Sequence, residues 1–225
     1  MGSLSRFDLG RIIREYKTPN LFETGTFWGD GAACALQYPF FKIISVEIIP
    51  EIATKAKTRF AKEDKVEIIE ADSIAALEKQ LPLLKGNTVF WLDAHFPGAD
   101  AKLADYASGE DDQFRLPLNK ELELISKYRK GFQDVLILDD LRIYEDGPFE
   151  KGLAPASAMP QGERGLKFVY DTFYASHYIF KSYLDEGYIL LFPKRSYNRN
   201  HFKLADMFKK KPVAEDHYLF NKTNV

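Results

Sequence analysis

Residues 23–31, Glu-Thr-Gly-Thr-Phe-Trp-Gly-Asp-Gly, combine glycines with carboxylates between an apolar run and an amphipathic run. Glycine accepts positive φ and lets a ligand lie against the backbone, and Gly25, Gly29 and Gly31 could all do this. Glu47 follows at the distance, about 20 residues, at which a carboxylate can hold ribose hydroxyls. The stretch predicts a site for a nucleoside-containing cofactor.

The type of cofactor follows from the other side chains of this loop. The spacing is not G-x-G-x-x-G, because Phe27 and Trp28 fill positions where a dinucleotide needs close backbone approach. Asp30, beside the expected helix start, would repel a pyrophosphate and suits a cationic group. S-adenosylmethionine carries an amine and a sulfonium and no phosphate, so it is favoured over NAD. The simpler alternative is a tight turn whose Asp30 only caps the helix. The residues of this loop expected to bind the cofactor are Glu23, Gly25, Thr26, Gly29, Asp30 and Gly31.

Short apolar runs that alternate with longer amphipathic segments supply the elements that position this loop. The alternation predicts a mostly parallel sheet with helices on both faces. The expected strands are residues 20–23, 42–47, 66–70, 88–93 and 134–139, and each ends in an acidic residue. The expected helices are residues 31–37, 50–61, 73–84, 117–129 and 166–175.

Ligands of an open parallel sheet bind beyond the carboxyl ends of its strands, where these acids would form one rim. The Glu47 carboxylate can accept both ribose hydroxyls. After the third strand, Asp72 could bind an adenine amino group, while Ser73 meets a ring nitrogen. Any single acid of the rim could instead be a helix cap or a turn residue.

Residues 177–183 and 188–192 form two further strand candidates around the turn Asp-Glu-Gly at 185–187. Strands this close must form an antiparallel hairpin, because a parallel return needs a dozen or more residues. The expected sheet therefore has seven strands. Residues 96–115 and 146–165 are expected to form loops that roof the site, and 194–225 an appendage to a single domain whose core spans about 18–193.

Composition narrows the class of protein. The 225 residues carry a net charge of -2, which disfavours a nucleic-acid partner. Cys34 is the only cysteine, so a disulfide within the chain and a cysteine-based zinc site are excluded. The sequence shows neither a membrane span nor the apolar core of a signal peptide, and a cytoplasmic location is expected.

Taken in order, the motifs resemble those of class I S-adenosylmethionine-dependent methyltransferases. They are Glu-Thr-Gly-Thr-Phe-Trp-Gly-Asp-Gly, Ser-Val-Glu47, Glu-Ala-Asp72-Ser73, Phe-Trp-Leu-Asp93-Ala-His95 and Leu-Asp139-Asp140. The match covers residues 18–193, including the hairpin that this family adds to its Rossmann-like, doubly wound sheet. The sequence departs from the family at Phe27, where many members have glycine.

The resemblance also implies a metal site, since the fourth and fifth strands are neighbours in this family. Asp93 would then approach Asp139 and Asp140, and three carboxylates suit Mg²⁺. Metal-dependent O-methyltransferases of the catechol and macrocin types use such a site to lower the pKa of an acceptor hydroxyl. His95 is the candidate base and Asp93 the second catalytic candidate, although His95 could ligate the metal and the Asp139-Asp140 pair could be structural.

The resulting functional prediction is methyl transfer from S-adenosylmethionine to an oxygen of a small-molecule or glycan acceptor, with assistance by Mg²⁺ as one version of it. The alternatives are metal-free transfer through Asp93 and His95, an NAD-type oxidoreductase, and a protein that binds the cofactor without catalysis. The aromatic-rich tail 197–220 could pack on a second copy in a homo-oligomer.

Overall fold

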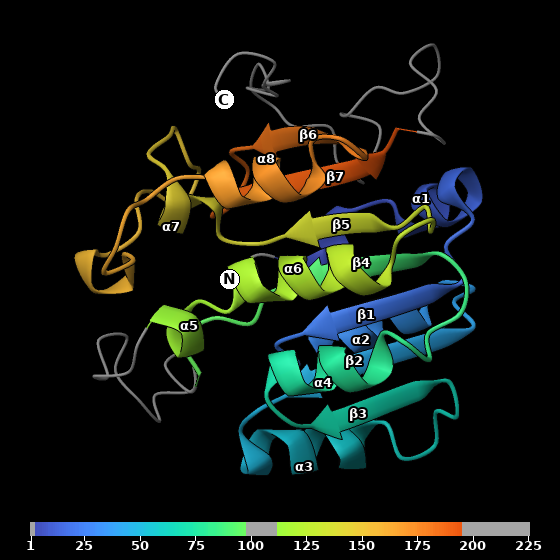
Figure 1. Ribbon diagram of the computed structural model, residues 1–225. Coiled ribbons are helices and arrows are strands. Elements are labelled where there is room, and N and C mark those ends of the chain that lie inside the picture. Colours follow the sequence, from blue (N-terminus) through green and yellow to red (C-terminus); the bar gives the residue numbers. More distant parts are fainter. Residues whose placement is uncertain (1–2, 98–111, 195–225) are drawn as a thin grey trace.

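The computed structural model describes residues 3–97 and 112–194, which build one seven-stranded sheet flanked by helices (Figure 1). The strand order is β3-β2-β1-β4-β5-β7-β6. The strands are β1 (Asn20–Thr24), β2 (Lys42–Glu47), β3 (Val66–Glu70), β4 (Thr88–Leu92), β5 (Val135–Leu138), β6 (His177–Ser182) and β7 (Tyr188–Pro193). Pairing is parallel from β3 to β5, and β7 is antiparallel to both β5 and β6. The predicted fold class, a doubly wound sheet ending in a hairpin, is confirmed.

Helices cover both faces of the sheet. One face carries α4 (Ser73–Gln80), α6 (Leu118–Tyr128) and α8 (Lys167–Phe173). The other carries α1 (Leu9–Tyr16), α2 (Asp30–Leu36) and the end of α3 (Pro50–Arg59). Shorter helical turns are η1 (Leu4–Arg6), α5 (Asp112–Arg115), α7 (Leu141–Tyr144) and η2 (Ala156–Ala158). The strands between the two layers are almost wholly buried, which accounts for their apolar sequences, except for the edge strand β3, whose residues are half-buried or exposed.

The N-terminal helix α1 is an element that the strand and helix patterns did not predict. Asp8 caps it, because its carboxylate accepts a hydrogen bond of 2.9 Å from the Arg11 amide. Leu9, Ile12 and Tyr16 of its inner face are buried against the sheet. Residues before 18 therefore contribute to the packed core, in addition to those expected.

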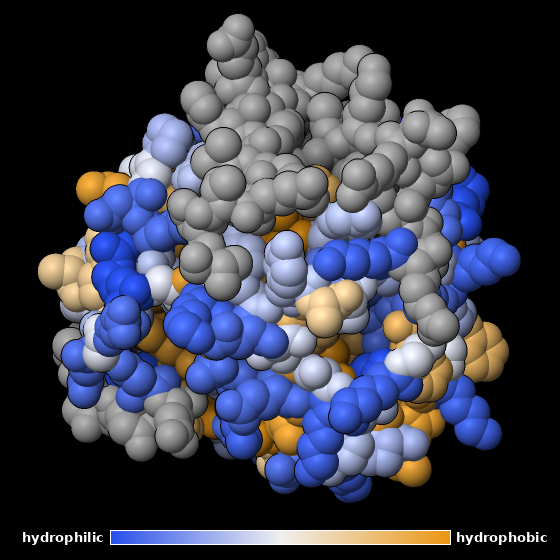
Figure 2. All heavy atoms as spheres, turned by 45° about the horizontal axis from the view of Figure 1, so that its top comes forward, coloured by the Kyte–Doolittle hydropathy of each residue, from blue (hydrophilic) through white to orange (hydrophobic). Residues whose placement is uncertain are grey.

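Five helices begin within a residue of their predicted start and end earlier than predicted. The predicted loop 146–165 contains only the short turn η2. Most of the first expected roof, residues 98–111, and the expected appendage from residue 195 lie outside the described residues. Within the described part, no helix is both long and apolar enough to cross a bilayer. The face in Figure 2 is largely hydrophilic, with hydrophobic side chains in the recesses between polar ones.

Candidate functional site

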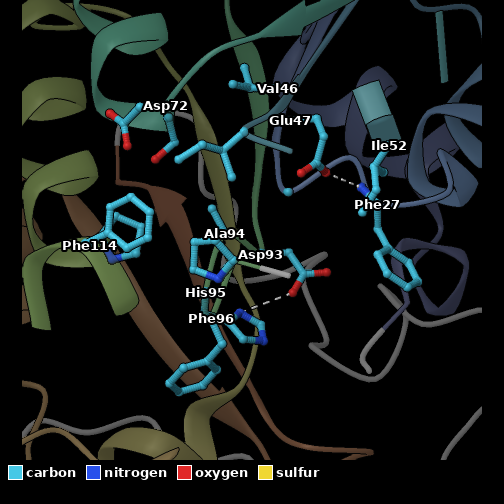
Figure 3. A pocket seen from close by; sticks show the side chains of 15 residues that line it. Phe27, Val46, Glu47, Ile52, Asp72, Asp93, Ala94, His95, Phe96 and Phe114 are labelled. Atoms are coloured by element: carbon cyan, nitrogen blue, oxygen red, sulfur yellow. Dashed lines mark hydrogen bonds and ion pairs between the residues drawn. The ribbon is translucent and has the colours of Figure 1, made fainter. Parts of the chain in front are cut away.

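A hollow of about 720 Å³, open mouth included, lies at the carboxyl ends of the parallel strands (Figure 3). Each of four strands supplies a lining residue at or after its end: Gly25 for β1, Glu47 for β2, Asp72 for β3 and Asp93 for β4. Open α/β sheets bind ligands at this edge.

Gly25 lets the loop after β1 lie against the end of β4. Its φ is +84°, and a Cβ at this position would lie 2.5 Å from the backbone oxygen of Asp93. Both the backbone conformation and the contact exclude a larger side chain. The floor of the hollow therefore depends on this glycine.

Glu23 and Thr26 are buried beneath the loop, Gly31 is half-buried beside them, and none of the three lines the hollow. Ser45 donates to the Glu23 carboxyl at 2.5 Å, and its hydroxyl lies 2.6 Å from that of Thr26. Burial raises the pKa of Glu23 to about 8, although the Ser45 hydrogen bond opposes the shift. A Cβ on Gly31 would lie 1.8 Å from Glu23 Oε1, so the carboxyl occupies the space that a side chain would take.

Asp30 does not take the position predicted for it. Its side chain is 84% exposed and pairs with Arg59 Nη1 at 2.8 Å, outside the lining of the hollow. Gly29, at φ +83°, is the residue before α2 and also lies outside the lining, facing the Phe60 ring. In the described structure the Asp30 carboxylate pairs with Arg59 and does not face the hollow, so a contact between Asp30 and a cationic ligand group stays a prediction.

Glu47 stands at the edge of the hollow with its carboxylate fixed by the backbone. Oε2 accepts from the Phe27 amide at 2.8 Å, and Oε1 accepts from the Ile49 amide at 2.9 Å (Figure 3). Burial raises its pKa, and these amides oppose the shift. Each oxygen keeps a lone pair, so the carboxylate can accept two further hydrogen bonds, as from vicinal hydroxyls.

Asp72 both caps α4 and lines the hollow. Its Oδ1 accepts from the amides of Ile74 and Ala75 at 2.9 and 3.1 Å. The capping alternative is correct, and it is compatible with ligand binding because both Asp72 and Ser73 remain in the lining. The cap orients the carboxylate.

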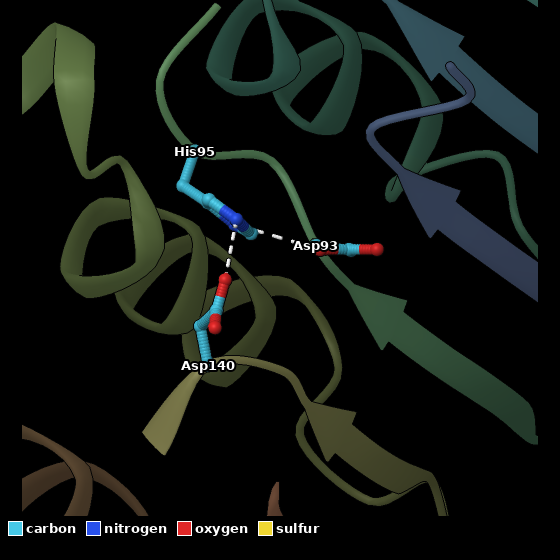
Figure 4. Close-up of side chains that lie close together, drawn as sticks. All are labelled: Asp93, His95 and Asp140. Atoms are coloured by element: carbon cyan, nitrogen blue, oxygen red, sulfur yellow. Dashed lines mark ion pairs between the residues drawn. The ribbon is translucent and has the colours of Figure 1, made fainter. Parts of the chain in front are cut away.

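Asp93, His95 and Asp140 form a cluster beside this hollow (Figure 4). His95 Nε2 lies 2.6 Å from Asp140 Oδ2, and its Nδ1 lies 3.5 Å from Asp93 Oδ1. One ligand atom from each residue lies within 4.8 Å of the others. Two carboxylates and an imidazole are donors that suit a divalent cation.

The electrostatics of the cluster favour a charged imidazole. Burial by itself lowers the pKa of His95, but Asp140, Asp93 and Asp139 outweigh it and raise the pKa to about 10. Burial and the nearby Asp139 raise the pKa of Asp93 well above its usual value. For Asp140 the effect of burial is outweighed by His95 and Arg142, so its pKa is lowered. His95 therefore carries a proton at neutral pH in the described state.

Asp139 points to a different place from the other two aspartates predicted to bind metal. It is not among the atoms that converge within 4.8 Å; it lines a small cavity behind the cluster with His95 and Glu121. Burial raises the pKa of Asp139 to about 7, and the Asp140 charge adds to the shift. In the described residues His95 takes the place in the cluster that the sequence suggested for Asp139.

Several lining residues were not among the predicted binding or catalytic residues, although Phe96, Pro97 and Phe114 belong to the segment 96–115 that was expected to roof the site. They are Phe27, Val46, Ile48, Ile52, Ala94, Phe96, Pro97, Phe114 and Pro117. Ile48 and Ala94 directly follow the strand-end acids, so their place in the lining could have been predicted from the sequence. Glu121 was not predicted as a site residue because it lies on the inner face of α6. Burial raises the pKa of its carboxyl to about 7, although the nearby Ser73 and Thr24 hydroxyls oppose the shift.

A scan against models of protein families gives no match, and a search of curated proteins gives none either. Solved structures do match. A Podospora anserina methyltransferase with bound S-adenosylhomocysteine is 13% identical, with a TM-score of 0.53, over 82% of this chain and 75% of that chain. An O-methyltransferase from Bacillus cereus, also in complex with S-adenosylhomocysteine, is 13% identical, with a TM-score of 0.51, over 83% and 79%. A Staphylococcus aureus protein with a proposed caffeoyl-CoA O-methyltransferase activity is 17% identical, with a TM-score of 0.51, over 82% and 80%.

These likenesses agree with the strand order and the antiparallel end of the sheet. The chain has the Rossmann-like fold of the class I methyltransferases. At these identities the comparison establishes the fold, and the activity must be argued from the site.

Proposed function

We propose that this protein is an S-adenosylmethionine-dependent methyltransferase that methylates a hydroxyl oxygen of a small-molecule or glycan acceptor. The observation that carries the proposal is the Glu47 carboxylate, held by two backbone amides at the edge of a hollow that also contains Asp72 and Asp93. A carboxylate held in this way is preorganised to accept the two ribose hydroxyls of the donor. The binding site for a nucleoside donor and the acid–base cluster around Asp93 would then share one cavity.

On the donor side, Glu47 would hold the ribose while Asp72 and Ser73 meet the adenine edge. Gly25, whose missing side chain lets the Asp93 backbone approach the loop, lines the same side of the hollow. Ile48 and Ile52 add apolar wall to the same hollow. This polar and apolar lining fits a nucleoside better than it fits a pyrophosphate, since no lysine or arginine lines the described part of the hollow.

On the acceptor side, we assign the proton-accepting role to Asp93. The raised pKa of its carboxylate makes it a stronger base than an ordinary aspartate. The acceptor O–H proton passes to Asp93, the oxygen forms a bond to the methyl carbon, and the carbon–sulfur bond breaks to leave a neutral thioether. His95, protonated between Asp93 and Asp140, would hold both carboxylates in place and offset their charge.

Mg²⁺ also fits the cluster, because several buried carboxylates surround one imidazole and the donors are oxygen and nitrogen atoms. Asp93, Asp140 and His95 would hold the ion. When bound, it would lower the pKa of the acceptor hydroxyl. Without it, Asp93 accepts the proton alone, and protonated His95 keeps the carboxylates in place.

Calorimetric titration with S-adenosylhomocysteine and with NAD tests the donor. We expect heat with S-adenosylhomocysteine only, and an affinity reduced about 10- to 100-fold by Glu47→Gln, since a hydrogen bond to a charged group contributes about 1.5–3 kcal/mol. Glu51→Gln, an exposed carboxylate on α3, is the matched control. A folded protein that binds NAD and not S-adenosylhomocysteine would overturn the proposal.

Transfer of a labelled methyl group across a panel of catechol and sugar acceptors tests the catalytic half. Asp93→Asn should abolish transfer while leaving the fold intact. Complete removal of divalent metal separates the two versions: transfer that survives chelation excludes the Mg²⁺-assisted one. Binding of the donor without transfer to any acceptor, in a panel that includes both classes, would favour a protein that binds the cofactor without catalysis.

A further inference from the structure

Asp140 has an unusual backbone conformation for a residue of the site. Its φ is +55°, in the left-handed region, although it is not glycine. Such a residue persists only where the surrounding structure determines its conformation. Contacts with the surrounding structure must therefore hold Asp140 in the position from which it meets His95.

The first contacts come from the turn between β6 and β7, residues 184–187. Leu141, directly after Asp140, donates its amide to the Gly187 carbonyl at 3.0 Å. Arg142 donates its amide to the Glu186 carbonyl at 3.2 Å. The start of α7 is thus tied by two backbone hydrogen bonds to a segment that lies more than 40 residues further along the chain.

The side chain of Arg142 adds a bridge between the same two segments. Its Nε lies 3.3 Å from Asp140 Oδ1, and its Nη2 lies 3.5 Å from Glu186 Oε1. Asp140 Oδ2, the other oxygen of this carboxylate, is the one that lies 2.6 Å from His95 Nε2. The guanidinium and the imidazole therefore hold opposite oxygens of one carboxylate.

Glu186 is itself a fixed anchor. Its side chain is 4% exposed and pairs with Lys151 at 3.0 Å. The neighbouring Asp185 accepts two hydrogen bonds from Arg6 and one from the Tyr188 hydroxyl. The turn is therefore fixed on three sides, and a displacement of the Arg142 guanidinium would have to break this network.

We propose that Arg142 is a positioning residue: anchored on Glu186 of the β6–β7 turn, it orients the Asp140 carboxylate toward His95. Arg142 does not line the hollow, so it acts through Asp140 and touches neither donor nor acceptor. A positioning role for Arg142 in catalysis rests on the proposed function. The contact between Asp140 and His95 can nevertheless be measured without donor, acceptor or metal.

The test is an NMR spectrum of the full chain labelled with ¹⁵N in its four histidines. The His95 Nε2–H group, hydrogen-bonded to Asp140, should give a low-field, slowly exchanging signal, assigned by its absence in His95→Gln. In Arg142→Ala we expect this signal to be lost to exchange with solvent, and in Glu186→Gln to be shifted less. Arg14→Ala, an exposed arginine on α1, should leave it unchanged.

Arg142→Lys distinguishes positioning from a loss of stability. Lysine keeps the charge and can reach Asp140 or Glu186, but it cannot bridge both, so the signal should be shifted and retained in a protein of nearly unchanged melting temperature. If Arg142→Ala does not fold, the His95 signal of Arg142→Lys decides whether the proposal holds. An unmoved His95 signal in a folded Arg142 variant, or no such signal in the parent, would overturn the proposal. The proposed function fails separately, if the parent does not bind S-adenosylhomocysteine.

Discussion

Replacing Gly31 by alanine tests whether the cofactor loop is fitted to the buried carboxyl beneath it. The new Cβ would lie 1.8 Å from Glu23 Oε1 and 2.9 Å from its Cδ. A carboxyl group on the surface would swing aside at little cost. Glu23 is 1% exposed and bonded to Ser45, so it has no free space to move into without losing that hydrogen bond.

The expected loss of stability follows from three contributions. Overpacking of a well-packed core costs about 1–3 kcal/mol. Loss of the buried hydrogen bond adds about 1–3 kcal/mol. Against these, alanine is better than glycine in a helix by up to about 1 kcal/mol. We therefore expect Gly31→Ala to lower the free energy of unfolding by about 1–5 kcal/mol, and to weaken S-adenosylhomocysteine binding because the loop must shift.

Urea unfolding of a double-mutant cycle checks this reasoning. Glu23→Ala removes the obstructing carboxyl, so Gly31→Ala should cost little or nothing in that background, with a coupling energy above about 1 kcal/mol. Gly162→Ala, where a Cβ meets nothing within 4 Å, is the matched control. An unchanged stability for Gly31→Ala, or the same cost with and without the Glu23 carboxyl, would refute the steric argument.

Three further outcomes are expected. His177 has its pKa lowered by burial from 6.5 to about 4, so its contribution to stability is complete above pH 6.5 and is lost as the pH falls towards 4. Urea unfolding should therefore show the parent losing about 2 kcal/mol more than His177→Gln between pH 7.5 and 5, and equal losses would contradict this. Gly25→Ala places a Cβ 2.5 Å from a backbone oxygen at the end of β4, so calorimetry should show no binding of S-adenosylhomocysteine. Gly152→Ala has a similar φ of +78° with open space around it and should bind normally; equal affinities would be evidence against the contact. Asp134→Ala leaves the buried Arg129 guanidinium without its carboxylate and should lower the free energy of unfolding by about 3–5 kcal/mol; a loss below 1 kcal/mol would show that the pair is not buried in solution.

The sheet could be predicted well from the sequence because its strands, except the edge strand β3, are buried on both faces. An apolar run that ends in an acid, such as Ile43 to Glu47, combines a core signal with a strand-end signal. Helix α1 was missed because only its Asp8 cap and three inward side chains mark it. The four-residue helix α7 is too short for any periodicity.

The site residues likewise divide into those that could be predicted from the sequence and those that could not. Glu47 and Asp72 were predictable because strand ends share one edge of a parallel sheet, whatever the loops do. The pairing of Asp30 with Arg59 could not be predicted, because Arg59 lies 29 residues away on another helix, and the spacing along the chain does not encode that contact. Which aspartate of the pair after β5 meets His95 depends on the left-handed backbone of Asp140, and a sequence pattern cannot give that orientation.

The position of β7 between β5 and β6 sets the order in which a growing chain can complete its site. Residues 20–93 contain the strands β1 to β4 and most of the donor side, and they leave the ribosome first. The contacts that hold Asp140 come from residues 186 and 187. Strand β7 then has to insert between β5, which is already docked, and β6, which has just been made. A nascent chain therefore contains most of its donor-binding half before it contains the residues that anchor Asp140, and among the described residues the turn before β7 completes the reaction centre.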